Sequence, residues 1–250
     1  MISKSILKLI RSLDQKKVRK ECGLFIAEGG KSVGDLLNSD IRCKYIIATS
    51  EWLASHTLPK EIEIIKAKRE EIERASFLRS PQGVIGIFHQ RNEKIDPTIA
   101  GTELCLALDD IQDPGNLGTI VRIADWFGIE HIFCSQGTAD IYNPKAVQAT
   151  MGAIGRIHLH YTSLPQLLEE LKDKIPIYGT FLDGENMYEK RLEKHGIIVM
   201  GNEGNGIGNE CAKHISERLF IPNYPIGRPT SESLNVSMAT AIICAEFRRQ

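Results

Sequence analysis

Three short segments of this chain place polar side chains beside glycine or proline where an apolar run ends. Their polar side chains with chemical potential are Asn116, Arg122, Glu203, Ser233 and Asn235. Together they offer a guanidinium, a carboxylate, a hydroxyl and two amides, without a histidine, cysteine or metal-ligand set for nucleophilic hydrolysis. Groups of this kind position reactants and stabilise charge, so the set favours transfer chemistry.

Each of these residues also has a purely structural interpretation. Asn116 could cap a helix, Arg122 could be an ordinary surface arginine, and Glu203 could cap the helix that follows its turn. The proline-rich loop from Ile221 to Thr230, which precedes Ser233, could be a stiff turn before a C-terminal helix.

The glycine-rich turn at 201–208 does not match a nucleotide-binding motif. Gly204, Gly206 and Gly208 are spaced G-x-G-x-G rather than G-x-G-x-x-G, and the chain has no G-x-x-x-x-G-K-[ST] motif. A nucleotide-binding oxidoreductase is therefore disfavoured. The glycines instead predict a turn in which the backbone approaches another group closely, with Glu203 at its tip.

The cysteines and histidines argue against a metal site and for a reducing compartment. The six cysteines are scattered without C-x-x-C pairs, and the seven histidines lack ligand spacing. We expect free thiols, no metal and a cytoplasmic protein. No apolar run is long enough to span a membrane and the N-terminus lacks a signal-peptide core, so no membrane association is expected.

Charge is distributed unevenly along the chain. Residues 1–95 contain 18 Lys and Arg against 12 Asp and Glu, whereas residues 96–250 contain 13 against 20. A basic N-terminal arm with an acidic partner domain fits RNA binding by the arm and chemistry in the domain, although a solvated basic helix is the plain alternative. The candidate RNA-binding residues are Lys16, Lys17, Arg19 and Lys20.

Strand-like and helix-like segments alternate through most of the chain, which predicts an α/β fold with a mostly parallel sheet covered by helices. We expect a small α/β domain at 1–90, a linker at 91–102 and a second domain at 103–250. In the second domain, strands are expected at 104–108, 131–134, 157–161, 177–182, 197–200 and 219–221. Helices are expected there at 117–127, 144–154, 164–172 and 233–248. Ligands in such sheets bind beyond the carboxyl ends of the strands, where the three polar segments fall.

The three segments, taken in order, resemble a known set of motifs. Asn116…Arg122, Gly201-Asn-Glu203-Gly and Ser233-Leu-Asn235-Val-Ser are similar to the motifs of the SpoU (TrmH-like) RNA 2′-O-methyltransferases of the SPOUT superfamily, across roughly residues 104–248. The stretch Lys16–Gly29 resembles the substrate-binding domain that precedes the catalytic domain in rRNA-modifying members.

This resemblance implies a fold, a cofactor and partners. The C-terminal domain would have helices on both faces of its sheet and a trefoil knot, and the protein would be a homodimer with its active site near the interface. S-adenosylmethionine would be the cofactor, and Asn116, Arg122, Glu203, Ser233 and Asn235 would form the catalytic set. The implied cofactor-binding residues are Gly201, Gly206, Ile221, Pro222 and Leu234.

The implied activity is methyl transfer to a ribose 2′-hydroxyl in RNA, with rRNA favoured because of the two-domain organisation. The alternatives are a tRNA 2′-O-methyltransferase and a non-catalytic RNA-binding or ribosome-assembly protein. The modified nucleotide, a housekeeping or antibiotic-resistance role, and the general base stay open. We expect Arg122 to clamp an RNA phosphate and stabilise the developing alkoxide, because its pKa above about 12 makes it a poor base.

Two regions depart from the family pattern. The loop at 223–232 is longer than usual and adds Pro225, Arg228 and Pro229, so its cofactor contacts are open. In the helix near 144–152, Gln148 and Thr150 replace the arginine and serine often found there, which leaves RNA contacts of that region open.

Overall fold

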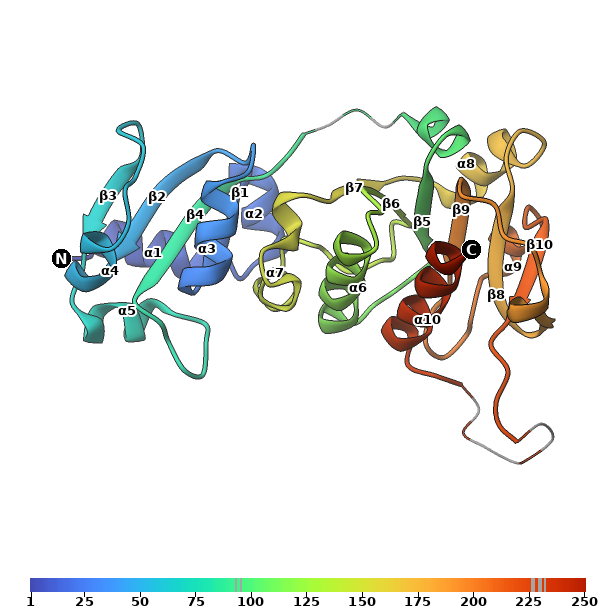
Figure 1. The fold of residues 1–250 in the computed structure, drawn as a ribbon. Helices are drawn as coiled ribbons and strands as arrows, with labels where there is room; N and C mark the ends of the chain where they lie inside the picture. The colour runs from blue at the N-terminus through green and yellow to red at the C-terminus, as the bar shows by residue number, and fades with distance from the viewer. Residues whose placement is uncertain (93, 95, 226–227, 229–230, 232) are drawn as a thin grey trace. The chain divides into compact units, whose positions relative to one another are not determined.

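The structure is a computed structural model that describes residues 1–92, 94, 96–225, 228, 231 and 233–250 (Figure 1). Its backbone contacts divide the chain into two compact units, Met1–Asn92 with Asp140–Arg156, and Glu93–Ala139 with Ile157–Gln250. The chain therefore passes between the units three times. A segment from the middle of the sequence, Asp140–Arg156, packs with N-terminal residues.

The first unit is built on a small mixed sheet. Its strands are β1 (Leu24–Glu28), β2 (Cys43–Ala48), β3 (Glu63–Lys66) and β4 (Val84–His89). Its helices are α1 (Lys4–Ser12), α2 (Lys16–Cys22), α3 (Gly30–Leu37), α4 (Ser50–Ala54), α5 (Arg69–Ala75) and α7 (Pro144–Thr150), with the 3-10 turn η2 (Ala153–Gly155). The order in the sheet is β1-β4-β2-β3, in which β4 is antiparallel to both neighbours and β3 runs parallel to β2.

Apolar side chains cover both faces of this sheet. On one face, Ile10 and Leu13 from the first helical segment are fully buried in a cluster with Leu24, Ile26 and strand residues of β2 and β4. On the other face the Phe25 ring lies between Phe88, at 5.8 Å between centroids, and Tyr142, at 4.8 Å. Tyr142 belongs to the 140–156 segment, so that segment contributes to the core of the first unit.

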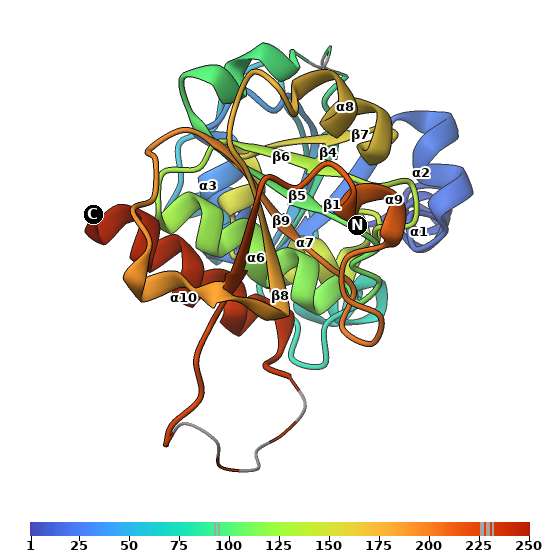
Figure 2. The ribbon, with the colours of Figure 1, turned by 90° about the vertical axis from the view of Figure 1, so that its right-hand side faces the viewer.

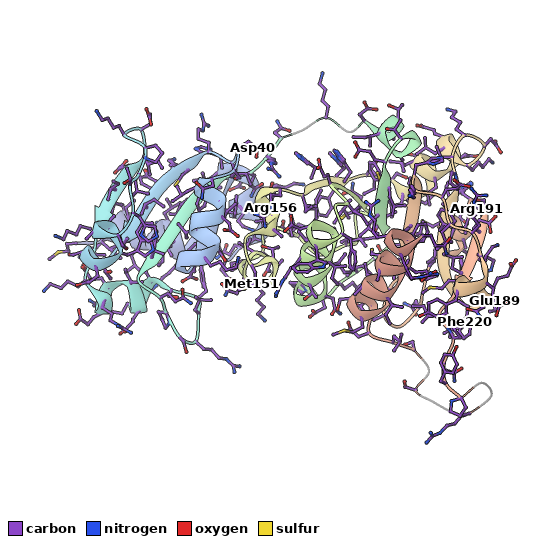
Figure 3. The ribbon with its side chains drawn as sticks, in the orientation of Figure 1. Asp40, Met151, Arg156, Glu189, Arg191 and Phe220 are labelled. Carbon is purple, nitrogen blue, oxygen red and sulfur yellow. The ribbon has the colours of Figure 1, made fainter. Side chains whose placement is uncertain are left out.

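Polar contacts also tie the 140–156 segment to the first unit. Arg91 donates hydrogen bonds to the carbonyl oxygens of Ile154 at 3.2 Å and Gly155 at 2.7 Å, and forms an ion pair with Asp40. Figure 3 labels Asp40 with Met151 and Arg156 in this unit. These bonds satisfy backbone carbonyl groups at the end of the segment, where the helix α7 has already finished.

The second unit is a parallel sheet. Its strands are β5 (Leu104–Leu108), β6 (His131–Cys134), β7 (His158–Tyr161), β8 (Ile177–Asn186), β9 (Gly196–Met200) and β10 (Glu217–Phe220). Its helices are α6 (Pro114–Trp126), α8 (Leu164–Leu171), α9 (Asn209–Ala212) and α10 (Val236–Arg249), with 3-10 turns η1 (Pro97–Gly101) and η3 (Met187–Glu189). The sheet order is β10-β8-β9-β5-β6-β7, and every pairing is parallel.

Helices lie on both faces of this sheet, as predicted (Figures 1 and 2). Helices α6 and α10 pack side by side on one face, and α8 and α9 lie on the other, where Leu164, Leu168 and Cys211 join a buried cluster with strand residues. Arg248 near the end of α10 donates to the carbonyl oxygens of Phe127 and Gly128, just after α6. The two helices therefore run in the same direction, with both N-termini at one edge of the sheet.

Three element boundaries differ from the prediction. Strand β8 continues to Asn186, four residues beyond the predicted end, near the region of Figure 3 where Glu189, Arg191 and Phe220 are labelled. Helix α10 begins at Val236 rather than at residue 233, because Asn235 is its N-cap. Helix α7 ends at Thr150 rather than at 154. Within the described residues, no helix is long and apolar enough to cross a lipid bilayer.

Candidate active site

The candidate site lies at one edge of the parallel sheet in the second unit. The segments that follow β5 and β9 and the N-termini of α6 and α10 meet there. Pro114 in the first turn of α6 starts that helix, and Asp113 caps it by accepting a hydrogen bond from the Asn116 N–H at 2.8 Å. The capping interpretation of Asn116 is therefore wrong, since Asp113 is the cap and leaves the Asn116 side chain available.

A chain of side-chain hydrogen bonds joins the three predicted segments. Asn116 Nδ2 donates to Glu203 Oε1 at 2.8 Å, across 87 positions of sequence. Asn235 Nδ2 donates to Asn116 Oδ1 at 3.1 Å, across 119 positions. Because a carboxylate only accepts, its bond with Asn116 fixes which end of that amide is the donor and which is the acceptor. Asn116 is thus held in one orientation between Glu203 and Asn235.

Asn235 has a second task at the start of α10. Its Oδ1 accepts from the Ser237 N–H at 3.0 Å, from Ser237 Oγ at 2.6 Å and from the Met238 N–H at 3.4 Å. The same side chain therefore caps α10 and reaches Asn116, which couples the start of α10 to the start of α6. The free N–H groups of both helix ends contribute positive potential at this edge.

The glycine-rich turn after β9 closes on itself. The backbone of Asn202 and Gly206 exchanges two hydrogen bonds of 2.9 Å, and Asn202 Oδ1 accepts from the N–H groups of Gly204 and Asn205. A Cβ on Gly201 would lie 2.2 Å from the carbonyl carbon of Gly206, so only glycine fits there. Gly206 adopts a φ of +67°, in the left-handed region.

Two aspartates that sequence reasoning missed anchor this turn to the end of β5. Asp109 Oδ2 accepts from the Gly208 N–H at 2.8 Å, and the Asp110 carbonyl accepts from Asn202 Nδ2 at 2.8 Å. Asp110 has a φ of +56°, and its carboxylate accepts from Ser135 Oγ at 2.6 Å. The Asp-Asp pair directly after an apolar strand, and the turn-forming Asn202 between glycines, were the available signals.

Arg122 and Ser233 lie outside the hydrogen-bonded chain. Both are exposed, and neither makes a hydrogen bond or ion pair with another residue in the part of the chain that the structure describes. Arg122 lies six residues after Asn116 on α6, with Trp126 one turn further on the same side. The Arg122 guanidinium is therefore available to an anionic ligand.

The predicted cofactor-binding residues follow strands or precede a helix at the same edge. Gly201 is buried and Gly206 is exposed. Ile221 and Pro222 come directly after β10 and are half-buried, while Leu234 is 50% exposed beside Asn235 in the sequence. Pro225 and Arg228 of the longer loop are exposed, whereas Pro229 is outside the described residues.

The chemistry of this edge does not include a thiol or a metal cluster. Burial raises the pKa of the Cys211 thiol to about 12, and the nearby Asp109 carboxylate adds to the rise, so Cys211 stays protonated at neutral pH. No group of three or more metal-ligating side chains occurs among the residues that the structure describes. What remains is an amide, carboxylate and guanidinium set that can orient reactants and stabilise negative charge.

The predicted RNA-binding residues separate into two kinds. Lys16, Lys17 and Lys20 are exposed on α2 of the first unit. Arg19 is 1% exposed, donates to Asp140 Oδ2 at 2.5 Å and 3.1 Å, and donates to the carbonyl oxygens of Leu13 and Asp14. Arg19 therefore has a structural role within the first unit and is not available to RNA.

The two substitutions noted in α7 also differ from each other. Thr150 is fully buried and donates to the Val147 carbonyl at 2.7 Å, so it contributes to packing rather than to a ligand surface. Gln148 is half-buried and keeps part of its side chain at the surface.

The fold and the site define an α/β protein that binds its ligand at the carboxyl edge of a parallel sheet. Residues 103–245 match the SpoU rRNA Methylase family, and the chain belongs to that family. This confirms the resemblance drawn from the three motifs. Residues 4–86 match the MRM3-like substrate binding domain.

Relatives with known names or structures cover nearly the whole chain. A Bacillus subtilis protein, the 23S rRNA (guanosine(2553)-2′-O)-methyltransferase RlmP, is 29% identical over 95% of this chain and 94% of its own length. The solved structure of a proposed RNA methyltransferase of the TrmH family from Porphyromonas gingivalis is 39% identical, with a TM-score of 0.90 and coverage of 100% and 99%. The AdoMet-bound rRNA methyltransferase from Sinorhizobium meliloti is 31% identical, with a TM-score of 0.86 and coverage of 100% and 96%.

Proposed function

We propose that this chain transfers a methyl group from S-adenosylmethionine to a ribose 2′-hydroxyl in ribosomal RNA. The observation that carries the proposal is the hydrogen-bonded chain Glu203–Asn116–Asn235, which joins the three family motifs at the sheet edge where α/β proteins bind ligands. The RlmP relative is named as a 23S rRNA 2′-O-methyltransferase, and the Sinorhizobium relative is AdoMet-bound. Both names support this substrate and this cofactor.

The residues at this edge fit S-adenosylmethionine. The turn at Gly201 is closed so tightly that no Cβ fits, which leaves main-chain groups as the contact surface, and Leu234 exposes an apolar side chain next to Asn235. Gly201, Gly206, Ile221, Pro222 and Leu234 would hold the cofactor, largely through the main chain. When bound, the cofactor supplies a methyl group that its sulfonium makes electrophilic.

The chain's own polar residues would orient the RNA and stabilise charge. Glu203 accepts from Asn116, which holds Asn116 Oδ1 toward Asn235 and keeps both helix starts in register. The free Arg122 guanidinium can bind a phosphate in a bidentate manner and stabilise the negative charge that develops on the 2′-oxygen. Ser233 is exposed beside this set and can contact the ribose.

We propose a homodimer that uses the α6–α10 face. These adjacent helices and the residue pair before α10 expose three large apolar side chains: Trp126 at 84%, Met238 at 60% and Leu234 at 50%. Exposed apolar surface of this kind marks an interaction site in a soluble protein. Arg122, on the same helix as Trp126, would then lie near the dimer interface.

Three further features belong to the proposal. RNA is held in part by Lys16, Lys17 and Lys20, which are exposed on α2. The C-terminal segment forms the trefoil knot of the SpoU fold, which is supported by Asn235 returning to Asn116 after the chain has passed β10. The cytoplasm is the compartment, supported by the free thiols of the six cysteines.

Titration calorimetry with S-adenosylmethionine tests the cofactor site. Wild-type protein should bind saturably, and Leu234→Pro should lose binding, because it alters the main chain before α10 without removing a helical hydrogen bond. Thermal unfolding of the variant checks that it is folded. Folded wild-type protein that fails to bind the cofactor, with or without RNA, would favour the non-catalytic RNA-binding alternative.

A further inference from the structure

The first unit carries an open hollow along α1 that the family motifs do not assign. Its volume is about 520 Å³, and it is lined by Lys4, Leu7, Lys8, Arg11, Ser12 and Gln15. All six residues belong to the N-terminal 15 residues of the chain. The lining combines three cations, two neutral hydrogen-bonding groups and one apolar side chain.

The three cations form a row on one side of the helix. Lys4, Lys8 and Arg11 occupy positions i, i+4 and i+7, which lie on one face, and they extend over about 10 Å at about 1.5 Å per residue. Helix α1 contains no acidic residue. Within the described residues, none of the three forms an ion pair.

Other exposed cations of the same unit are neutralised by neighbouring carboxylates. Lys17 pairs with Glu21 at 3.9 Å, Lys31 with Asp35 at 3.4 Å and Arg69 with Glu73 at 3.2 Å, each at i,i+4 spacing. A row of three cations without such pairing keeps its positive potential. The α1 row therefore differs from the ordinary charged surface of this unit.

The row is held in a fixed orientation. On the opposite side of α1, Ile10 is fully buried in the core of the unit, and Ser3 caps the helix start. The N-terminus is tied down as well, because the Met1 ammonium donates to the Lys66 carbonyl at 2.7 Å and the Ile2 N–H donates to Glu71 at 3.0 Å. A helix fixed in this way presents its cations with little ordering cost on binding.

The shape and chemistry of the hollow select an extended polyanion. Three cations in a line match a run of phosphates better than a single phosphate, which would need converging groups. The lining has no aromatic side chain, so it cannot stack a base and would not read sequence. Ser12 Oγ donates to the Leu9 carbonyl at 2.7 Å, so its lone pairs can accept from a ribose 2′-hydroxyl.

We propose that the α1 hollow binds the sugar-phosphate backbone of the substrate RNA without regard to sequence, as a subsite separate from the lysines of α2. This inference rests on the proposed function only in taking RNA as the substrate. Each lost phosphate contact on a single strand lowers the slope of log Kobs against log [salt] by about 0.7.

The test compares variants that lose the same charge in different places. Lys4→Gln with Lys8→Gln and Arg11→Gln removes the row, and Lys31→Gln with Lys60→Gln and Arg69→Gln removes three exposed cations elsewhere in the unit. Binding of a single-stranded oligouridylate is measured by fluorescence anisotropy over a range of salt concentrations. The row variant should lose about 2 from the salt slope and bind at least about tenfold more weakly at low salt, whereas the control should keep most of its slope.

A smaller pair of variants covers a folding defect at Arg11, which also donates to the Arg74 carbonyl. Lys4→Gln with Lys8→Gln should lose about 1.4 from the slope, compared with Lys31→Gln and Lys60→Gln. An unchanged slope in the row variants, or an equal loss in row and control variants, would overturn the subsite. Cofactor binding and methyl transfer by the wild type are measured separately. Their absence would count against the proposed function without altering the slope comparison.

Discussion

The side-chain amide of Asn235 donates a hydrogen bond to the side-chain oxygen of Asn116 at 3.1 Å, although the two residues are 119 positions apart. Asn116 in turn donates to Glu203, so one amide connects the start of α6, the glycine-rich turn and the start of α10. Asn116 can make both bonds because Asp113 caps α6 in its place. The geometry of the candidate site therefore depends on this central amide.

Replacing Asn116 by alanine should lower methyl transfer strongly while leaving the fold intact. Without the amide, Glu203 and Asn235 lose their common partner, and misplacement of groups at a reacting centre costs roughly 100-fold in rate. We expect kcat to fall by about that factor, with a smaller change in cofactor affinity. Asn205→Ala, in the same turn but exposed, is the matched control. Equal activity of the two variants would contradict a role for the hydrogen-bonded chain.

Replacing Arg122 by lysine should lose most of the rate. Lysine keeps the charge but lacks the planar fork that binds a phosphate in a bidentate manner, so we expect a decrease on the order of 100-fold in kcat/KM. Arg122 is exposed and makes no ion pair with a described residue, so stability should change little. Near-normal turnover by Arg122→Lys, measured by transfer of labelled methyl to rRNA, would exclude both a clamping and a charge-stabilising role.

Two glycines of one turn offer a paired test of the cofactor site. Gly201→Ala would place a Cβ 2.2 Å from backbone of Gly206, whereas the nearest atom to a Cβ on Gly204 is 3.6 Å away. The first substitution forces the backbone to move, at a cost of about 1–3 kcal/mol in stability, and should abolish or greatly weaken cofactor binding. Gly204→Ala should be tolerated in both thermal unfolding and calorimetry. Normal cofactor binding by a Gly201→Ala protein would place the cofactor elsewhere.

Much of the second unit could be predicted from sequence because its strands are buried runs. Leu104–Leu108 and the strand at 196–200 are buried throughout, and apolar runs between turn residues are typical of parallel strands. The end of β8 could not be predicted, because beyond Leu182 the strand is polar and mostly exposed. The three motifs identified Asn116, Glu203 and Asn235, whereas the bonds among them depend on contacts far apart in sequence.

The first unit shows a different limit of sequence reasoning. Arg19 lies in a basic stretch and was predicted to bind RNA, yet its guanidinium pairs with Asp140, 121 positions later. The packing of residues 140–156 with N-terminal residues has no local signal, because it depends on this pair and on the Phe25–Tyr142 contact. Helix α2 was likewise missed, since its sequence resembles a charged arm.

The Arg19–Asp140 pair predicts a stability effect separate from RNA binding. Arg19→Met should lower the free energy of unfolding by about 3–5 kcal/mol, because it leaves a mostly buried Asp140 without its partner. Lys20→Met removes the same charge from an exposed neighbour and should cost little. Urea unfolding followed by Trp52 fluorescence in a Trp126→Phe background reports the first unit alone. Equal midpoints for the two variants would show that the pair contributes nothing.

The proposed dimer predicts that Trp126→Glu yields a folded monomer. A carboxylate at this 84% exposed position costs little in an isolated chain but would be buried without a partner in an apolar interface. Leu182→Glu, at a 71% exposed position on β8, is the control and should stay dimeric. Sedimentation velocity distinguishes the states. A monomeric wild-type protein with full activity would refute the dimer.

The most direct test of the central claim is the site of methyl transfer. Purified protein is incubated with S-adenosylmethionine carrying a labelled methyl group and with rRNA that lacks 2′-O-methylation, and the RNA is digested to nucleosides. The account predicts label in a 2′-O-methylated nucleoside, at a level that Asn116→Ala greatly reduces. Label on a base, or no label with a cofactor-binding protein and intact ribosomal RNA, would contradict it.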